Sequence, residues 1–228
     1  MTKAFVFDTE TTGIVDPEII EAAWIEPLFV DYLSLKKDYQ IADSFCARYR
    51  PSKPISLSAM SVHHIMDEDL KDCPHSSTFK FPDDIDYLIG HNVDFDWSAA
   101  GKPVVNRICT LALSRYLWPE LDSHNQSAML YFLERDNARD LLRGKAHSAA
   151  DDVRNCVIIL GYILRKLGDD VDSWGALWQR SEIARIPTVM PFGKHKGMPI
   201  KDIPPDYKRW LLNQPDIDQY LYKALTES

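Results

Sequence analysis

Short apolar runs separated by polar turns occupy the first part of the chain, a pattern typical of strands buried in a sheet. Three such runs come first, at residues 3–8, 19–30 and 41–49. Gly13 and Pro17 supply the turn between the first two runs, and Asp8 ends the first one. Three strands in succession predict an antiparallel meander at one side of a sheet.

Helical spacing starts after Pro54, where Ser56 is placed to cap a helix. Farther along, the pattern predicts two strands and two helices, at residues 86–90, 104–109, 110–117 and 128–134. The strongest helical pattern covers residues 147–167, where apolar residues recur every three or four positions until Gly168. Strands interleaved with helices predict an α/β domain.

The last part of the chain has a different pattern. Residues 174–185 form an amphipathic helix candidate, and residues 187–213 are rich in proline, glycine and lysine. We therefore expect a main domain at 1–168, a linker with a short helix at 169–186, and a small basic and aromatic C-terminal hairpin-helix module at 187–228.

The composition limits the class of protein. The 228 residues are 45% hydrophobic, 26% charged and 11% aromatic, which suits one or two compact domains and not a disordered chain. No stretch approaches the roughly 20 apolar residues of a membrane span, and no secretion signal is visible. The four cysteines include no CxxC pair, so free thiols in a reducing cytosol are expected. We therefore predict a cytoplasmic protein without a membrane partner.

The net charge is −8, from 26 basic and 34 acidic residues. Taken alone, this charge argues against a nucleic-acid substrate, because a protein that binds a polyanion is expected to be basic, at least locally.

Acidic residues form three separated clusters. In the first, residues 8–13, Asp8 and Glu10 stand two positions apart on a predicted strand, so their side chains share one face. Such a pair can hold a hard cation while the Thr-Thr-Gly turn approaches a phosphate. The alternative interpretation is a solvated strand edge.

The second cluster, residues 90–96, follows an apolar strand and begins a helix. Helix capping explains Asp94, but it does not explain why His91 and Asn92 come together with Asp96. In the third cluster, His147 and the acid at position 152 are about 140° apart on a helix. They could flank one site if the histidine lies at or before the helix start; the alternative is an ordinary acidic helix N-terminus beside a surface histidine.

Together the three clusters resemble the motifs of the DEDDh (DnaQ-like, RNase T-like) 3′→5′ exonucleases, in the family's order. The resemblance covers residues 4–168. Residues 55–65 are similar to the family's helix between its first two motifs, except that His64 replaces a glycine. Residues 115–119, 191–197 and 207–212 resemble the exodeoxyribonuclease X group of this family, which favours DNA as the substrate. The resemblance implies an α/β fold, the ribonuclease H-like sandwich with a mixed central sheet.

The resemblance also implies roles for individual residues. Two divalent cations, Mg²⁺ or Mn²⁺, would lie about 4 Å apart, one activating the attacking water and the other stabilising the leaving oxygen. Four acids would hold them, Asp8 bridging both and Asp96 acting through water: Asp8, Glu10, Asp96 and Asp152. His147 would be the general base. His63 and His64 compete for that role by residue type, but they lack the downstream aspartate.

Further residues are candidates for substrate binding, with His91 and Asn92 assigned to positioning. The candidates are Thr11, Thr12, Val62, His63, Asn92, Lys194 and Lys196. Ile14 and Val15 would either wedge against a terminal base pair or pack into the core as turn residues.

The C-terminal segment changes the interpretation of the net charge. Residues 187–214 hold five basic and two acidic residues, a net charge of +3, which leaves −11 for the rest of the chain. Aromatic residues interleave with these bases, as in a surface that follows phosphates or stacks bases. The alternative is an aromatic core with a lysine rim. We expect Trp210 and Leu211 to be buried, and Lys194 and Lys196 to be exposed.

The predicted function is a metal-dependent 3′→5′ exodeoxyribonuclease that acts on 3′ ends of single-stranded or duplex DNA and releases nucleoside 5′-monophosphates. Two divalent ions would bring the net charge of −8 to −4, which predicts modest, salt-dependent DNA affinity. The alternatives are a 3′→5′ exoribonuclease or oligoribonuclease acting on RNA, and a proofreading or binding subunit of a polymerase assembly. Partners left open are a second copy of the chain and a polymerase or repair protein.

Overall fold

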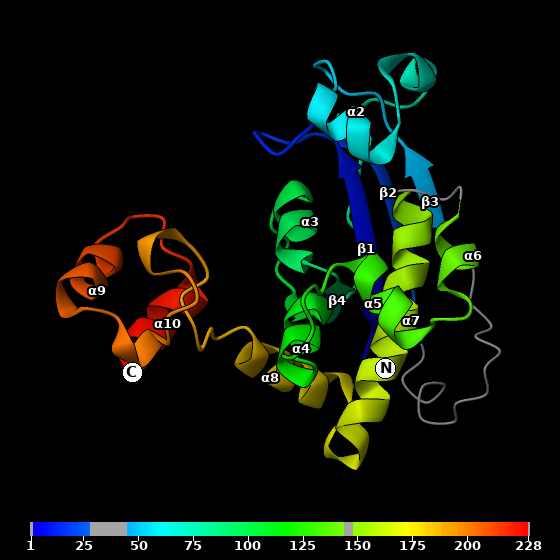
Figure 1. Cartoon of the computed structure of the whole chain (residues 1–228). Helices are drawn as coiled ribbons and strands as arrows, with labels where there is room; N and C mark the ends of the chain where they lie inside the picture. Colours follow the sequence, from blue (N-terminus) through cyan, green and yellow to red (C-terminus); the bar gives the residue numbers. More distant parts are fainter. Residues whose placement is uncertain (1, 28–44, 144–147, 228) are drawn as a thin grey trace.

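The computed structural model describes residues 2–27, 45–143 and 148–227, and Figure 1 shows the whole chain. Within these residues one sheet has five strands in the order β3-β2-β1-β4-β5. The strands are β1 (Ala4–Thr11), β2 (Ile19–Ile25), β3 (Phe45–Arg48), β4 (Tyr87–Gly90) and β5 (Asn106–Cys109). β1, β2 and β3 pair antiparallel, whereas β1, β4 and β5 pair parallel. The predicted meander and mixed sheet are thus confirmed.

Helices cover both faces of this sheet (Figure 1). They are α2 (Leu57–His63), α3 (Val93–Ala99), α4 (Thr110–Leu117), α5 (Gln126–Leu133), α6 (Ala138–Leu142), α7 (Ala149–Leu167) and α8 (Trp174–Ala184). Short 3-10 turns are η1 (Asp67–Leu70), η2 (Ser76–Thr78) and η3 (Gly168–Asp170). Ser56 caps α2 as predicted, because its hydroxyl accepts a hydrogen bond from the backbone N–H of Ala59 at 3.2 Å.

The alternation of side chains along β1 sends successive residues to opposite layers. Ala4 and Val6 pack into the core shared with α7, whose apolar stripe is buried over its length. Phe7 points to the opposite layer, where it packs with Leu88 of β4 and Val93 of α3. The even-numbered residues of β1 therefore face α7, and this continues at the polar end of the strand.

Helix α8 packs against α4 and β5. Leu177 is fully buried in the core that includes α7, and the Ser181 hydroxyl accepts a hydrogen bond from the backbone N–H of Cys109 at the end of β5, at 2.9 Å. Residues of the segment expected to be a linker thus contribute to the main core. All four cysteines are free, as predicted.

A separate apolar core forms in the C-terminal segment, which Figure 1 shows in orange and red beside α3 and α4. Its elements are η4 (Gly193–His195), η5 (Ile200–Asp202), α9 (Pro205–Leu212) and α10 (Gln219–Glu227). Leu211 is buried as predicted, but the prediction for Trp210 is wrong, because its side chain is 53% exposed. On α9 these neighbours point in different directions, and Leu211 takes the place in the core.

An ion-pair network joins this module to the main body. The buried Arg185 guanidinium donates from Nη1 to the carboxylate of Asp94 on α3 at 3.1 Å and to the hydroxyl of Tyr220 on α10 at 2.8 Å. Arg107 forms a further ion pair with Asp94. Asp94 therefore forms ion pairs with two arginines, in addition to the helix capping expected from its position. Among the described residues, no helix is long and apolar enough to cross a membrane.

Candidate functional site

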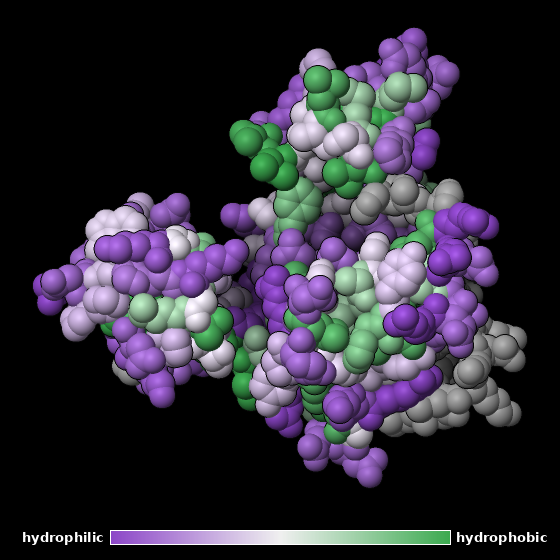
Figure 2. All heavy atoms as spheres, viewed as in Figure 1, coloured by the Kyte–Doolittle hydropathy of each residue, from purple (hydrophilic) through white to green (hydrophobic). Residues whose placement is uncertain are grey.

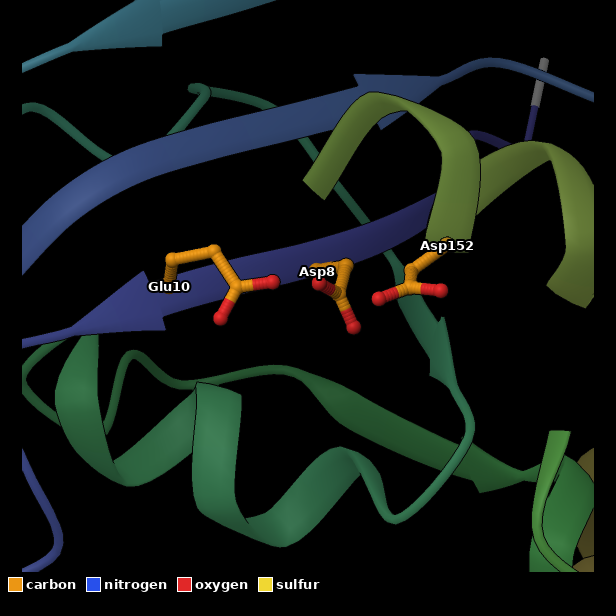
Figure 3. A group of neighbouring side chains, drawn as sticks. All are labelled: Asp8, Glu10 and Asp152. Atoms are coloured by element: carbon orange, nitrogen blue, oxygen red, sulfur yellow. The ribbon is translucent and has the colours of Figure 1, made fainter. Parts of the chain in front are cut away.

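Three carboxylates converge where the polar end of β1 meets the first turn of α7 (Figure 3). One oxygen from each of Asp8, Glu10 and Asp152 lies within 4.8 Å of the others. Asp8 and Glu10 continue the row of β1 side chains that faces α7. Both carboxylates therefore lie close to Asp152 on the first turn of that helix. The sequence prediction that these acids share one face is confirmed.

The position of α7 depends on a buried acid that sequence reasoning missed. Glu21 lies opposite Glu10 on β2, and its Oε1 accepts the backbone N–H of Ala149, the first residue of α7, at 2.9 Å. Its Oε2 accepts from Arg48 of β3 at 2.7 Å. The only sequence signal was an acid inside the apolar run of residues 19–25.

Two further hydrogen bonds hold the first turn of α7. The side chain of Ser148 caps the helix by accepting the backbone N–H of Asp151 at 3.2 Å. Gln126 of α5 donates to the backbone oxygen of Asp152 at 3.0 Å. Hydrogen bonds with Glu21, Ser148 and Gln126 thus hold the helix turn that carries Asp152.

The fourth predicted acid, Asp96, lies on α3 and contacts β1 through hydrogen bonds with Thr9. Its Oδ1 accepts hydrogen bonds from both the backbone N–H of Thr9, at 3.0 Å, and the Thr9 hydroxyl, at 2.7 Å. The side chain is 5% exposed. Asp96 is therefore attached to the strand residue between Asp8 and Glu10, close enough for its charge to raise the pKa of both.

Burial and mutual repulsion disfavour negative charge at all of these positions. Burial is the largest cause of the raised pKa of Asp8, followed by the charges of Asp96, Asp152 and Glu10. Burial and the neighbouring Asp152 raise the pKa of Glu10 to about 9, and burial raises that of Asp96 to about 7. A group of oxygen donors that carries this unfavourable negative charge fits hard divalent cations, which bind carboxylates and offset the repulsion.

The loop after β1 lies tightly against α2. The Thr11 hydroxyl donates to the backbone oxygen of Gly13 at 3.0 Å, and the Thr12 hydroxyl accepts the backbone N–H of Glu18 at 3.1 Å. A Cβ at Gly13 would lie 3.0 Å from the Ser56 hydroxyl oxygen, so glycine permits this approach. Both threonines, proposed to contact substrate, are buried and also form the turn itself.

The helix α2 presents two adjacent histidines differently. His63 is buried, its Nδ1 accepts the backbone N–H of Ile65 at 3.0 Å, and its Nε2 lies 3.3 Å from the backbone oxygen of Thr11. His64 is exposed and ends α2 in a left-handed conformation, with φ of 59°. A glycine is favoured at such a position, which explains the residue type that the family has there.

Exposed apolar groups gather over α2 and the adjoining loop (Figure 2). Ile14 and Val15 are 84% and 82% exposed, which excludes the alternative that they pack into the core. Val62 is about half-exposed on α2.

A groove of about 550 Å³ lies where β4 meets α3 and the loop before α5. It is lined by His91, Asn92, Leu111, Arg115, Asp122, Ser123, His124 and Asn125. His91 bonds through Nδ1 with the Thr110 hydroxyl at 3.0 Å and through Nε2 with the backbone oxygen of His124 at 2.8 Å. Burial lowers the pKa of His91 to about 4, so the ring is neutral near pH 7. It connects Thr110 of α4 with His124 of the loop before α5.

The remaining predicted residues are two lysines and the predicted general base. Lys194 and Lys196 are exposed, as predicted, on the C-terminal module. His147, predicted to be the general base, lies outside the described residues.

A mixed sheet that carries an acidic centre between its central strand and a long helix defines an α/β protein of the ribonuclease H-like fold. The solved structure of Exonuclease X in complex with 5′ overhanging duplex DNA matches with a TM-score of 0.57 and 23% identity, over 79% of this chain and 99% of that one. Escherichia coli Exonuclease I in complex with a dT13 oligonucleotide matches with a TM-score of 0.52 and 15% identity, over 73% and 42%.

Curated sequences extend the likeness along the chain. Exodeoxyribonuclease 10 of Escherichia coli (strain K12) is 28% identical over 218 residues, which cover 92% of this chain and 91% of that protein. DNA polymerase III PolC-type of Bacillus cereus is 30% identical over 181 residues, 73% of this chain but 11% of the polymerase. The family described as "Putative quorum-sensing-regulated virulence factor" matches residues 180–215. The chain is therefore a homologue of exonuclease enzymes, similar to Exodeoxyribonuclease 10 over most of its length.

Proposed function

We propose that the chain is a divalent-metal-dependent 3′→5′ exodeoxyribonuclease. It hydrolyses the terminal phosphodiester bond of DNA by a two-metal mechanism and releases nucleoside 5′-monophosphates. The convergence of Asp8, Glu10 and Asp152, with one oxygen of each within 4.8 Å of the others, carries this proposal, because a bound cation would offset the repulsion between three partly buried carboxylates. The likeness to Exodeoxyribonuclease 10 supports DNA as the substrate.

The metal ligands come from three elements. Asp8 and Glu10 on β1 and Asp152 on α7 would hold cations directly, and Asp96 on α3 would complete the set. Bound Mg²⁺ or Mn²⁺ would polarise the scissile phosphate and favour ionisation of the attacking water. Thr9 keeps Asp96 oriented by donating two hydrogen bonds to it.

His147 is our proposed general base, which accepts the proton of the attacking water. It stands two positions before Ala149, whose N–H is held by Glu21. The environment of His63 supports this choice, because both its ring nitrogens lie against backbone groups. His91 is engaged in the same way, through Thr110 and His124. His63 and His91 thus stabilise the fold through hydrogen bonds. We assign His91 and Asn92, which line the groove, to positioning of the substrate.

The 3′-terminal nucleotide would lie between the carboxylates and α2. Our candidates for contacting it are Thr11 and Thr12 after β1 and Val62 and His63 on α2, together with Asn92, which lines the groove. The exposed Ile14 and Val15 are placed to press against a terminal base pair of a duplex. Lys194 and Lys196 would contact phosphates farther along the strand.

A second candidate function follows from the polymerase match. The aligned segment of the PolC-type polymerase makes up 11% of that protein, so a similar segment occurs within a DNA polymerase. This favours a proofreading role with a polymerase partner as the alternative. A 3′→5′ exoribonuclease remains the alternative within the same chemistry, and we place either reaction in the cytoplasm.

A substrate panel tests the proposal. Single-stranded DNA, duplex DNA and RNA of one sequence, labelled at the 5′ end, are incubated with the chain in Mg²⁺ or in EDTA. We expect a ladder of progressively shortened DNA in Mg²⁺ alone, and none with Asp8→Asn. The exposed Asp169→Asn is the matched control and should retain activity. Immediate release of the labelled 5′ nucleotide would show degradation in the 5′→3′ direction. Faster degradation of RNA than of DNA would show that RNA is the substrate.

A further inference from the structure

The C-terminal module carries an exposed surface of aromatic and basic side chains, separate from the carboxylate site. It is formed by the turn at residues 191–197 together with one side of α9. We call it the aromatic–lysine surface, and its members are Phe192, Lys194, His195, Lys196, Tyr207 and Trp210.

Two glycines shape the turn. Gly193 and Gly197 both have positive φ, of 71° and 84°, in the left-handed region that glycine tolerates. A Cβ at Gly193 would lie 2.8 Å from the hydroxyl of Tyr207, so a larger residue at position 193 would displace the tyrosine side chain. The intervening residues are therefore held at the tip of a tight turn, against α9.

The rings form a continuous series across the surface. The His195 ring contacts Tyr207 edge-on with centroids 4.6 Å apart, and Tyr207 lies 5.3 Å from Trp210 at an interplanar angle of 33°. Trp210 and Phe192 are 53% and 49% exposed, although the module has a core that buries Leu211. Trp210 and Phe192 are thus not needed to fill that core, whereas Tyr207 is partly buried, packs against the core and presents the rest of its ring between His195 and Trp210.

The charge around these rings is positive. Lys194 and Lys196 are exposed on either side of His195, and neither belongs to an ion pair in the described part of the chain. Residues 187–214 carry +3, whereas the rest of the chain carries −11. Protein–protein interfaces are enriched in aromatic residues but depleted of lysine, whereas aromatic rings between lysines suit stacked bases and phosphates.

We propose that the aromatic–lysine surface binds single-stranded DNA, stacking bases on Tyr207 and Trp210 and contacting phosphates through Lys194 and Lys196. The inference rests on the proposed function, and the bound segment is the part of the substrate strand upstream of its 3′ end. The module lies beside α3, the helix that carries Asp96, and Arg185 joins α3 to α10 (Figure 1). The surface therefore lies on a module that Arg185 attaches to the helix carrying Asp96.

Binding is measured separately from cleavage. Fluorescence anisotropy of a labelled 20-nucleotide single-stranded DNA is followed with the full chain in EDTA, where turnover is prevented. Trp210→Ala and the double variant Lys194→Ala, Lys196→Ala should each weaken binding roughly fivefold or more, and the double variant should flatten the dependence on salt. Lys223→Ala, an exposed lysine of α10 in the same module, is the matched control and should bind normally.

Cleavage of short and long strands gives the second measurement. In Mg²⁺, both variants should lose kcat/KM on the 20-nucleotide strand, while a trinucleotide that cannot reach the module is cleaved as by the unsubstituted chain. Absence of cleavage on every strand would contradict the proposed function but not the binding surface.

Three results would overturn the inference itself. They are unchanged DNA affinity in both variants, tighter binding of the matching RNA, and loss of self-association in sedimentation with DNA binding intact. Circular dichroism checks that the variants are folded, and the exposure of all three substituted side chains makes unfolding an unexpected result.

Discussion

The carboxylate of Glu21 accepts a hydrogen bond from the backbone N–H of Ala149 at 2.9 Å, which joins β2 to the first residue of α7. A negative group at this helix end is favoured by the helix dipole. Three residues farther along α7, Asp152 points at Asp8 and Glu10 (Figure 3). Glu21 is therefore a positioning residue: it acts on the carboxylate site through the helix.

Removing Glu21 should affect both stability and turnover. Glu21→Ala leaves the Ala149 N–H buried without its acceptor, and we expect a loss of about 1–3 kcal/mol in the free energy of unfolding. We also expect kcat to fall more than KM rises, because Asp152 is displaced. Glu21→Gln keeps an acceptor oxygen and should restore most of the activity.

Urea unfolding and steady-state kinetics measure these effects. Arg48→Ala is the control, since Arg48 is partly exposed and its removal leaves the Ala149 bond in place. Equal losses in the Gln and Ala variants would show that charge, and not the hydrogen bond to α7, is what matters.

The bond between Thr9 and Asp96 should set the acid side of the pH profile. Hydrogen bonds from Thr9 lower the pKa of Asp96, which burial has raised to about 7. Thr9→Val keeps the side-chain shape but removes the hydroxyl donor, so the pKa rises further. The acid limb of kcat/KM should move upward by about one pH unit, since a hydrogen bond to a charged group is worth about that much. An unchanged limb would mean that Asp96 does not need to ionise for activity.

Stability and metal binding should be linked to pH through Glu10. Its pKa is raised from 4.5 to about 9, so between these values the folded chain holds a proton that the unfolded chain releases. This group therefore makes the metal-free chain less stable as pH rises from about 4.5 to about 9. Because cations bind the ionised carboxylates, the gain in Tm from Mg²⁺ should be larger at pH 9 than at pH 6.

Thermal denaturation with Mg²⁺ or EDTA across this range measures the gain. Asp8→Asn should abolish most of it, whereas Asp169→Asn should not. A gain that is independent of pH, or that survives Asp8→Asn, would place the cation elsewhere.

His64 offers a stabilising substitution. The residue ends α2 with φ of 59°, which costs a side chain about 1 kcal/mol relative to glycine. His64→Gly should therefore raise the free energy of unfolding by about 0.5–1 kcal/mol, while His64→Ala should not. Activity should persist in both variants, because the general base is assigned to His147. Loss of activity in both, with the fold intact, would instead give His64 a chemical role.

Local patterns were sufficient for much of the fold and for the carboxylates. Alternation along residues 4–10 predicts that Asp8 and Glu10 share a face, and this depends only on strand geometry. Ser56 could be recognised as a helix cap because its partner is three residues away. The expected helix at 147–167 is α7, described from Ala149. The three acidic clusters, in order, resemble exonuclease motifs, and the comparisons find exonucleases among the similar proteins.

The tertiary structure decided what those residues contact. Glu21 reaches Ala149 across 128 positions, and Thr9 reaches Asp96 across 87, separations at which no local periodicity operates. Asp94 looked like a capping acid but pairs with Arg107 and Arg185, which come from other elements. Trp210 was expected inside the module, yet Leu211 fills the core and the larger ring remains outside. Hydrophobic pattern and motif spacing thus determine strands, helices and the candidate metal ligands, whereas the packing of distant segments determines which polar groups support the site and which side chains remain exposed.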